Sequence, residues 1–246
     1  MDDIKTWLEV TRAKGTAYSD AVECPQRGGR YGEAYVQSVS GSKVHALSDE
    51  GSYFIQKNAT TGTGIASTAA VTAYDATKPF LYLYNSATAS EGTRIYLDYL
   101  KLQVTSAGTN GTALWYDMVL DNIARYTSGG TASTFINPNM DSSATQSATG
   151  YAGALVAPAA SSDVRKVCGG AIRLVIPVVG DQYLFNFGSP SCTGSSLALA
   201  GTAITSFVSP APPIVVGPGD SFLVYLWLPS QDGASSYEYE LGFWQR

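Results

Sequence analysis

Apolar and polar positions alternate in short runs from about Ser52 onward. In "TRIYLDYLKLQVTS", an extended strand places Ile95, Leu97 and Tyr99 on one face and the intervening residues, with Leu100, on the other. Comparable runs are "SYFIQK", "KPFLYLYNS", "ALWYDMVLDN", "GYAGALVAP", the two halves of "GAIRLVIPVVGDQYLFNFG", "SFLVYLWLP" and "SSYEYELGFW". Each is bounded by turn residues, which indicates a β-strand.

Clusters of Gly, Pro, Asn and Ser separate these runs. "AGTNGT" contains Asn110-Gly111, a dipeptide typical of a β-hairpin turn, and "SPAPPIVVGPGD" predicts a strand guarded by prolines. The stretch from Ser128 to Gly150 is of low complexity. We count about eight to ten strands with local connections, which predicts an antiparallel β-sandwich or barrel. A domain of about 200 residues favours a jelly roll over an immunoglobulin-like sandwich of about 100.

The first fifty residues follow a different pattern. Residues 2–14 predict a short helix, because Ile4, Trp7 and Leu8 share one face and two aspartates stand at its start. From Gly15 to about Gly51 there is little periodicity, which predicts an extended arm. We therefore expect two parts, a helix and arm over residues 1–50 and a β-sandwich over residues 51–246.

Charge excludes some classes of partner. Charged residues make up 14% of the chain and its formal net charge is -5, whereas binding to a phosphate backbone needs clustered basic residues. The one close basic group is Arg27 and Arg30 in "PQRGGRYGE", which fits a solvated turn. The N-terminal residues do not resemble a signal peptide, and no apolar run reaches the roughly eighteen residues of a membrane span. We expect neither nucleic acid nor membrane as a partner.

The three cysteines, Cys24, Cys168 and Cys192, are widely spaced and form no CxxC pair, so a zinc site is not expected. An odd number fits thiols in a reducing compartment better than a secreted disulfide framework. A bridge between Cys168 and Cys192 stays open at this stage, because both lie near expected strand ends.

Candidate catalytic groups are few. His45 is the only histidine, and its neighbourhood offers no G-x-S-x-G nucleophile elbow. Glu238 and Glu240 lie on one face of the last strand, about 7 Å apart, which is a separation that glycosidases use. Two acids facing water on a half-exposed strand produce the same pattern. "GTGIAS" lacks the third glycine of a dinucleotide-binding fingerprint. We therefore assign no catalytic, cofactor-binding or metal-binding residue.

Sixteen tyrosines and four tryptophans are compatible with a sugar-binding platform, but equally with a core and a protein interface. Residues near the two chain ends are the better candidates for contact with another protein. These candidate contact residues are Trp7, Leu8, Arg27, Arg30, Tyr237, Tyr239 and Trp244.

Several segments together resemble a known family. "YTSGGTAST", "YAGALVAP", "RLVIPVVGDQYLFNFG" and, above all, "PPIVVGPGDSFLVYLWLPSQDGASSYEYELGFWQR" are similar to the jelly-roll cement, or decoration, proteins of podovirus capsids. The resemblance covers about residues 50–246. It implies a jelly roll bound as a homodimer to the outside of an icosahedral head and clamping neighbouring major capsid subunits, with a trimer as the alternative oligomeric state. It transfers no individual binding residue.

We therefore expect a non-enzymatic virion structural protein, made in the host cytoplasm and located on the capsid exterior, with the major capsid protein as partner and no cofactor. One alternative is a tail-associated β-sandwich that binds a receptor or glycan. Another is a polysaccharide-degrading enzyme that uses Glu238 and Glu240 as its two acids.

Overall fold

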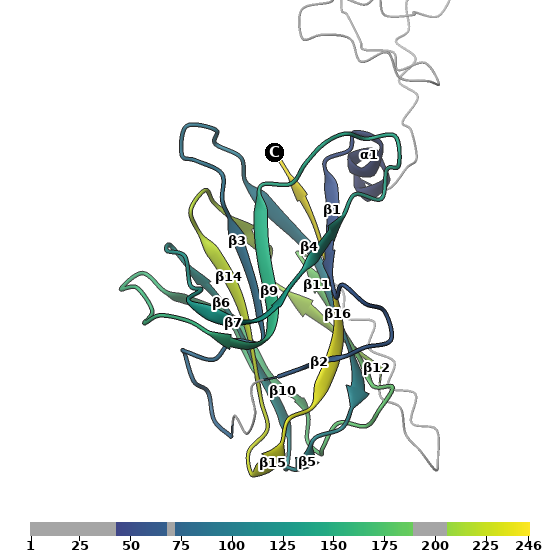
Figure 1. The fold of residues 1–246 in the computed structure, drawn as a ribbon, viewed down its shortest axis with the longest axis vertical. Coiled ribbons are helices and arrows are strands. Elements are labelled where there is room, and N and C mark those ends of the chain that lie inside the picture. The colour runs from purple at the N-terminus through teal and green to yellow at the C-terminus, as the bar shows by residue number, and fades with distance from the viewer. Residues whose placement is uncertain (1–42, 68–71, 189–205) are drawn as a thin grey trace, which may run out of the picture. The chain divides into compact units, whose positions relative to one another are not determined.

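The computed structural model describes residues 43–67, 72–188 and 206–246, which form two β-sheets packed face to face (Figure 1). The expected helix over residues 2–14 lies outside the described residues. In chain order the elements are α1 (Lys43–Asp49), β1 (Tyr53–Lys57), β2 (Ile65–Ala66), β3 (Leu81–Asn85), β4 (Ile95–Ser106), β5 (Thr109–Asn110), β6 (Leu114–Asp121), β7 (Ser128–Ala132), β8 (Thr134–Ile136), β9 (Ala148–Val156), β10 (Arg165–Arg173), β11 (Gln182–Phe187), β12 (Ser206–Ala211), β13 (Val215–Val216), β14 (Ser221–Trp227), β15 (Gln231–Gly233) and β16 (Ser236–Gln245).

The first sheet has eight strands in the order β12-β11-β4-β16-β1-β8, with β13 paired to β4 and β2 paired to β16. The second has six, in the order β10-β6-β14-β3-β9-β7. Pairing is antiparallel except between β11 and β12. A short pair, β15 and β5, lies at one end (Figure 1). The predicted sandwich of antiparallel strands is confirmed at this level.

The core lies between the two sheets, where aromatic side chains from opposite sheets meet. The ring of Tyr116 on β6 lies 4.8 Å from that of Phe185 on β11, and Phe187 on β11 lies 6.0 Å from Phe222 on β14. Among the fully buried polar side chains, that of Gln56 on β1 donates from Nε2 to the carbonyl of Tyr82 on the facing sheet at 3.2 Å. Such a bond offsets part of the cost of burying an amide.

Strand β16 lies between β4 and β1 and pairs with both. Its alternation therefore separates a buried inner face from a half-exposed outer face rather than marking a sheet edge. The inner face carries Tyr237, Tyr239, Leu241 and Phe243, each 2% exposed or less.

Strand β4 does not keep the simple alternation expected from its sequence. Leu97 and Leu100 both face the core, although they are three residues apart, and Tyr99 faces outward. The register along β16 shifts between Gly242 and Phe243, so that Asp98 is an extra residue on β4. A β-bulge of this kind reverses the alternation of the side chains that follow it. The prediction that Leu97 and Leu100 lie on different faces of the strand is therefore wrong.

The turn at Asn110-Gly111 has the expected conformation but a different role. Both residues have positive φ, 58° and 112°, as this dipeptide favours. However, the strands on either side, β4 and β6, belong to different sheets, and β5 pairs with β15. The turn carries the chain from one sheet to the other, so the predicted hairpin is wrong.

A helix occurs where an irregular arm was expected. The carbonyl of Leu47, which is 1% exposed, accepts bonds from Ser52 N and Oγ at 3.0 and 3.1 Å. Asn139 donates to the carbonyl of Asp49 and Asn137 to that of Gly51. The compact unit of described residues begins at Lys43, so α1 belongs to it. The low-complexity stretch that provides these asparagines also contains β7 and β8.

Tyr239 and Glu240 are adjacent on β16 but face opposite sides, which allows a matched test. We expect Tyr239→Ala to lower the free energy of unfolding by about 3–5 kcal/mol, because it empties a core site. Glu240→Ala removes a surface ion pair and is expected to cost less than about 1 kcal/mol. Urea unfolding of both variants measures the difference, and equal losses would contradict the assignment of the two faces.

Candidate functional site

The outer face of the eight-stranded sheet carries a group of packed aromatic rings, which we call the aromatic patch: Tyr53, Tyr96, Tyr99 and Trp244. Tyr96 on β4 and Trp244 on β16 are cross-strand partners whose half-buried rings are stacked, 5.6 Å apart and 4° from parallel. Tyr53 and Tyr99 cover Gly242, where a Cβ would lie 2.3 Å from Tyr53 Oη and 2.4 Å from the Tyr99 ring. A glycine at this position leaves free the space that the two side chains occupy.

Hydrogen bonding holds the aromatic patch in place. Tyr53 Oη donates to Asp98 Oδ2 at 2.8 Å, so the residue inserted by the β-bulge anchors a ring of the patch. Burial, followed by the bond to Asp98, raises the pKa of Tyr53. Burial, with the charges of Glu240 and Asp98, raises the pKa of Tyr99 to about 12. Both phenols are therefore neutral at physiological pH.

Next to the aromatic patch on the same face is a charged row: Lys57, Lys101, Glu238 and Glu240. Lys101 Nζ lies 3.6 Å from Glu240, and Glu238 accepts a bond from the backbone N–H of Gly62. The row lines a shallow hollow of about 40 Å³. The two glutamates share one face as predicted, and each has a partner within the chain. Ion pairs this exposed contribute little to stability, so the row supplies a polar surface beside the aromatic patch.

The structure separates the candidate contact residues. Trp244 lies on the outer face, in the aromatic patch. Tyr237 and Tyr239 are 0% and 2% exposed and lie in the core, so their proposed role in contact with another protein is corrected to one in packing. The strand alternates as expected, but its inner face is the one that carries these tyrosines. Trp7, Leu8, Arg27 and Arg30 lie outside the described residues.

Other residues considered from the sequence are dispersed. His45 lies on α1 with an exposed side chain. Cys168 is half-buried on β10, where burial and the nearby Asp117 raise the pKa of its thiol to about 11, and Cys192 lies outside the described residues. Over the described ranges, no group of three or more His, Cys, Asp and Glu has the geometry to hold a metal ion. Within the same ranges, no helix has the length and apolar character needed to cross a membrane.

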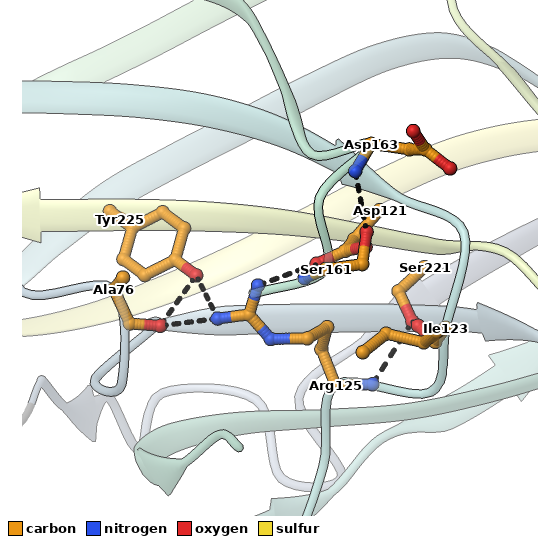
Figure 2. Close-up of polar contacts among 8 residues, drawn as sticks. All are labelled: Ala76, Asp121, Ile123, Arg125, Ser161, Asp163, Ser221 and Tyr225. Carbon is orange, nitrogen blue, oxygen red and sulfur yellow. Dashed lines mark hydrogen bonds and ion pairs between the residues drawn. The ribbon is translucent and has the colours of Figure 1, made fainter. Parts of the chain in front are cut away.

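The outer face of the six-stranded sheet is covered in part by three loops, which a buried ion pair joins (Figure 2). Arg125, in the loop after β6, donates from Nη1 to Asp121 Oδ2 at 2.7 Å and from Nη2 to the carbonyl of Ala76 at 2.6 Å. Both charged side chains are fully buried. The backbone N–H of Ser161, in the loop before β10, also donates to Asp121, and Tyr225 Oη donates to Ala76. This ion-pair network joins the loops around residues 76, 125 and 161 to β14.

A second aromatic group, which was not predicted from the sequence, is formed by tyrosines of these loops and of the strands beneath them. The rings of Tyr126 and Tyr151 are stacked, with centroids 4.0 Å apart and planes 3° from parallel. The ring centroids of Tyr74 and Tyr225 are 5.0 Å apart. The signal was present in "SFLVYLWLP", where Leu223, Tyr225 and Trp227 occupy every second position. The outward-facing side of this strand is covered by these rings.

The chain matches no protein-family model, no curated protein and no solved structure in comparisons with each.

The ion-pair network can be tested against a surface pair of the same charges. We expect Arg125→Met to lower the free energy of unfolding by about 3–5 kcal/mol, because it leaves Asp121 buried without its counter-ion. Lys78→Met breaks the exposed pair with Asp75, at 3.3 Å, and should cost less than about 1 kcal/mol. Denaturant unfolding compares the two variants, and similar losses would argue against the role given to Arg125.

The same network predicts a dependence of stability on pH. Burial opposes ionisation of Asp121, but the bonds from Ser161 and Arg125 outweigh it and lower the pKa of the carboxyl. Its stabilisation is then present above the unfolded pKa of about 3.9 and is lost as the pH falls through the folded value. We expect the difference in stability between wild type and Asp121→Asn to shrink below about pH 4. A difference that stays constant from pH 7 to pH 3 would contradict this.

Proposed function

We propose that this chain is a non-enzymatic structural protein of a virion, a cement protein that binds the outer surface of a phage head and bridges neighbouring major capsid subunits. The proposal rests on the sequence resemblance and on one structural observation. That observation is the aromatic patch, which presents stacked, half-buried rings on the outer face of a broad sheet.

The strand order supports a jelly roll as the finer description of the fold. Eight strands form two antiparallel sets of four, β1-β16-β4-β11 and β3-β14-β6-β10. In chain order the first of the eight pairs with the last, the second with the seventh, the third with the sixth, and the fourth with the fifth. A long antiparallel hairpin rolled into two sheets has this pairing, and it is the arrangement of a jelly roll.

The aromatic patch suits contact with a protein. Tyr and Trp side chains are enriched at the energetic centres of interfaces, because they bury large areas with few rotatable bonds. Here the Tyr96 and Trp244 rings are already held by stacking and the Tyr53 ring by Asp98, so a partner orders little on binding. The neighbouring charged row provides the polar rim that usually surrounds such a centre.

Binding of this kind strengthens a capsid by linkage. A protein that binds two adjacent subunits only in the assembled shell stabilises assembly over separated subunits. Because the same contact is repeated at every equivalent position of the shell, a modest affinity at each one adds up to a large stabilisation of the whole. A stiff sandwich with a broad face is suited to this role because it does not deform when the shell is strained.

The proposed contact predicts the effect of a double substitution. We expect Tyr96→Ala with Trp244→Ala to weaken binding to DNA-filled heads that lack the protein by about tenfold or more, equivalent to about 1.4 kcal/mol. Tyr84→Ala removes a half-buried ring from the opposite sheet and should bind like the wild type. Co-sedimentation with heads measures affinity, after circular dichroism has verified that each variant is folded.

Unchanged binding of the double variant would reject the aromatic patch as the contact. The broader proposal is tested by quantitative mass spectrometry of purified particles. Copies in a fixed ratio to the major capsid protein are expected, whereas a few copies confined to the tail would overturn it.

A further inference from the structure

The outer face of the six-stranded sheet ends in a row of three aromatic rings. Tyr74 meets Trp227 on β14 edge to face, with ring centroids 5.9 Å apart and planes at 73°. Trp227 is the cross-strand partner of Trp115 on β6, and the two indoles are stacked, 6.4 Å apart and 15° from parallel. Trp115 is 37% exposed. The row therefore runs across the strands toward β10 and ends in an exposed indole.

Beyond Trp115, small residues leave a ledge on β10. Ala171 lies directly opposite Trp115, and Gly169 lies opposite Asp117. A Cβ at Gly169 would lie 1.9 Å from Asp117 Oδ1, so the carboxylate occupies the space that a side chain would fill. The position that continues the row, on β10 opposite Trp115, carries only the methyl group of Ala171. We call this position the ledge.

Fixed polar groups border the ledge. Lys166 Nζ donates to Asp117 Oδ2 at 2.7 Å and lies 3.6 Å from the centroid of the Tyr74 ring. The Lys166 side chain is 55% exposed and that of Asp117 is 17% exposed, so both remain accessible to a ligand. The loop that carries Tyr74 is held by Arg125 and Tyr225 through the carbonyl of Ala76 (Figure 2). The site is therefore organised before any ligand arrives.

A flat aromatic face beside a carboxylate and an ammonium group fits one class of ligand closely. A pyranose ring has an apolar face whose C–H bonds are attracted to the negative face of an indole, and a rim of hydroxyls that both donate and accept hydrogen bonds. Asp117 provides acceptors and Lys166 provides donors. An aromatic side chain from a protein would leave both polar groups without new partners, and a carboxylate in the site disfavours a phosphate backbone.

We propose that the ledge binds a pyranose unit of a carbohydrate, stacked on Trp115 above Ala171, with its hydroxyls bonded to Asp117 and Lys166. This inference does not rest on the proposed capsid role. The ledge and the aromatic patch lie on the outer faces of opposite sheets, so the protein can use both at once. A protein fixed to a surface through the eight-stranded sheet would present the ledge outward.

The test titrates the full-length protein with maltohexaose, cellohexaose, chitohexaose and mannohexaose by isothermal calorimetry. At least one sugar is expected to bind with a Kd below about 1 mM, as suits a shallow site with a single stacking ring. Trp115→Ala is expected to weaken that binding at least tenfold. Tyr84→Ala, on the same sheet but away from the ledge, should leave it unchanged.

A second variant keeps the test decisive if Trp115→Ala is poorly folded. Ala171→Phe fills the ledge with a ring that strands accommodate well and leaves Trp115 in place. It should abolish sugar binding without loss of stability. The proposal is overturned if none of the four sugars binds at about 10 mM, or if the bound sugar is indifferent to both substitutions. Neither result alters the expected binding of the aromatic patch to heads.

Discussion

Strand β14 is buried on both faces, and the rest of the structure depends on this constraint. Phe222, Val224 and Leu226 pack against the facing sheet, so Leu223 and Tyr225 require a second cover. Loops provide it, but a loop brings polar backbone groups into an apolar site, and these need partners. Arg125 provides partners for two buried groups at once, because its guanidinium donates to the carbonyl of Ala76 and to the carboxylate of Asp121. A buried ion pair is expensive when half of it is missing, which makes the cover cooperative.

The buried ion-pair network also affects the exposed outer face of the six-stranded sheet. The loop held by Ala76 is the one that carries Tyr74, and Tyr74 supports Trp227, which in turn stacks on Trp115. A deeply buried polar network thus fixes the position of an exposed indole. On the other sheet a single hydrogen bond has a comparable effect. Asp98, the extra residue of the bulge, holds Tyr53 over Gly242. In both cases a hydrogen bond to an irregular part of the chain helps to fix an aromatic side chain: Trp115 ends its row exposed, whereas Tyr53 is buried beside the half-buried rings of Tyr96 and Trp244.

Alternation along the chain was enough to predict most of the long strands and the sandwich, because burial on one face imposes a period of two whatever the partner strand is. It did not reveal which face was inward, so Tyr237 and Tyr239 were taken for contact residues. Asn110-Gly111 was recognised as a turn, since its positive φ is a local property, but whether the flanking strands pair is decided by the whole fold. Helix α1 was missed because Leu47 alone is buried among residues 44–49 and distant asparagines hold the end of the helix.

The ledge lay beyond prediction for a related reason. Trp115 and Trp227 are far apart in sequence and become neighbours only because β6 and β14 pair in one register. A slip of one residue would turn one indole into the core and break the row. Ala171 on β10 looks in the sequence like a weak strand former, yet opposite Trp115 its small side chain leaves the indole without a bulky neighbour on that strand. The site combines a small residue on β10 with tryptophans on β6 and β14. It can be recognised only once the order of these strands is known.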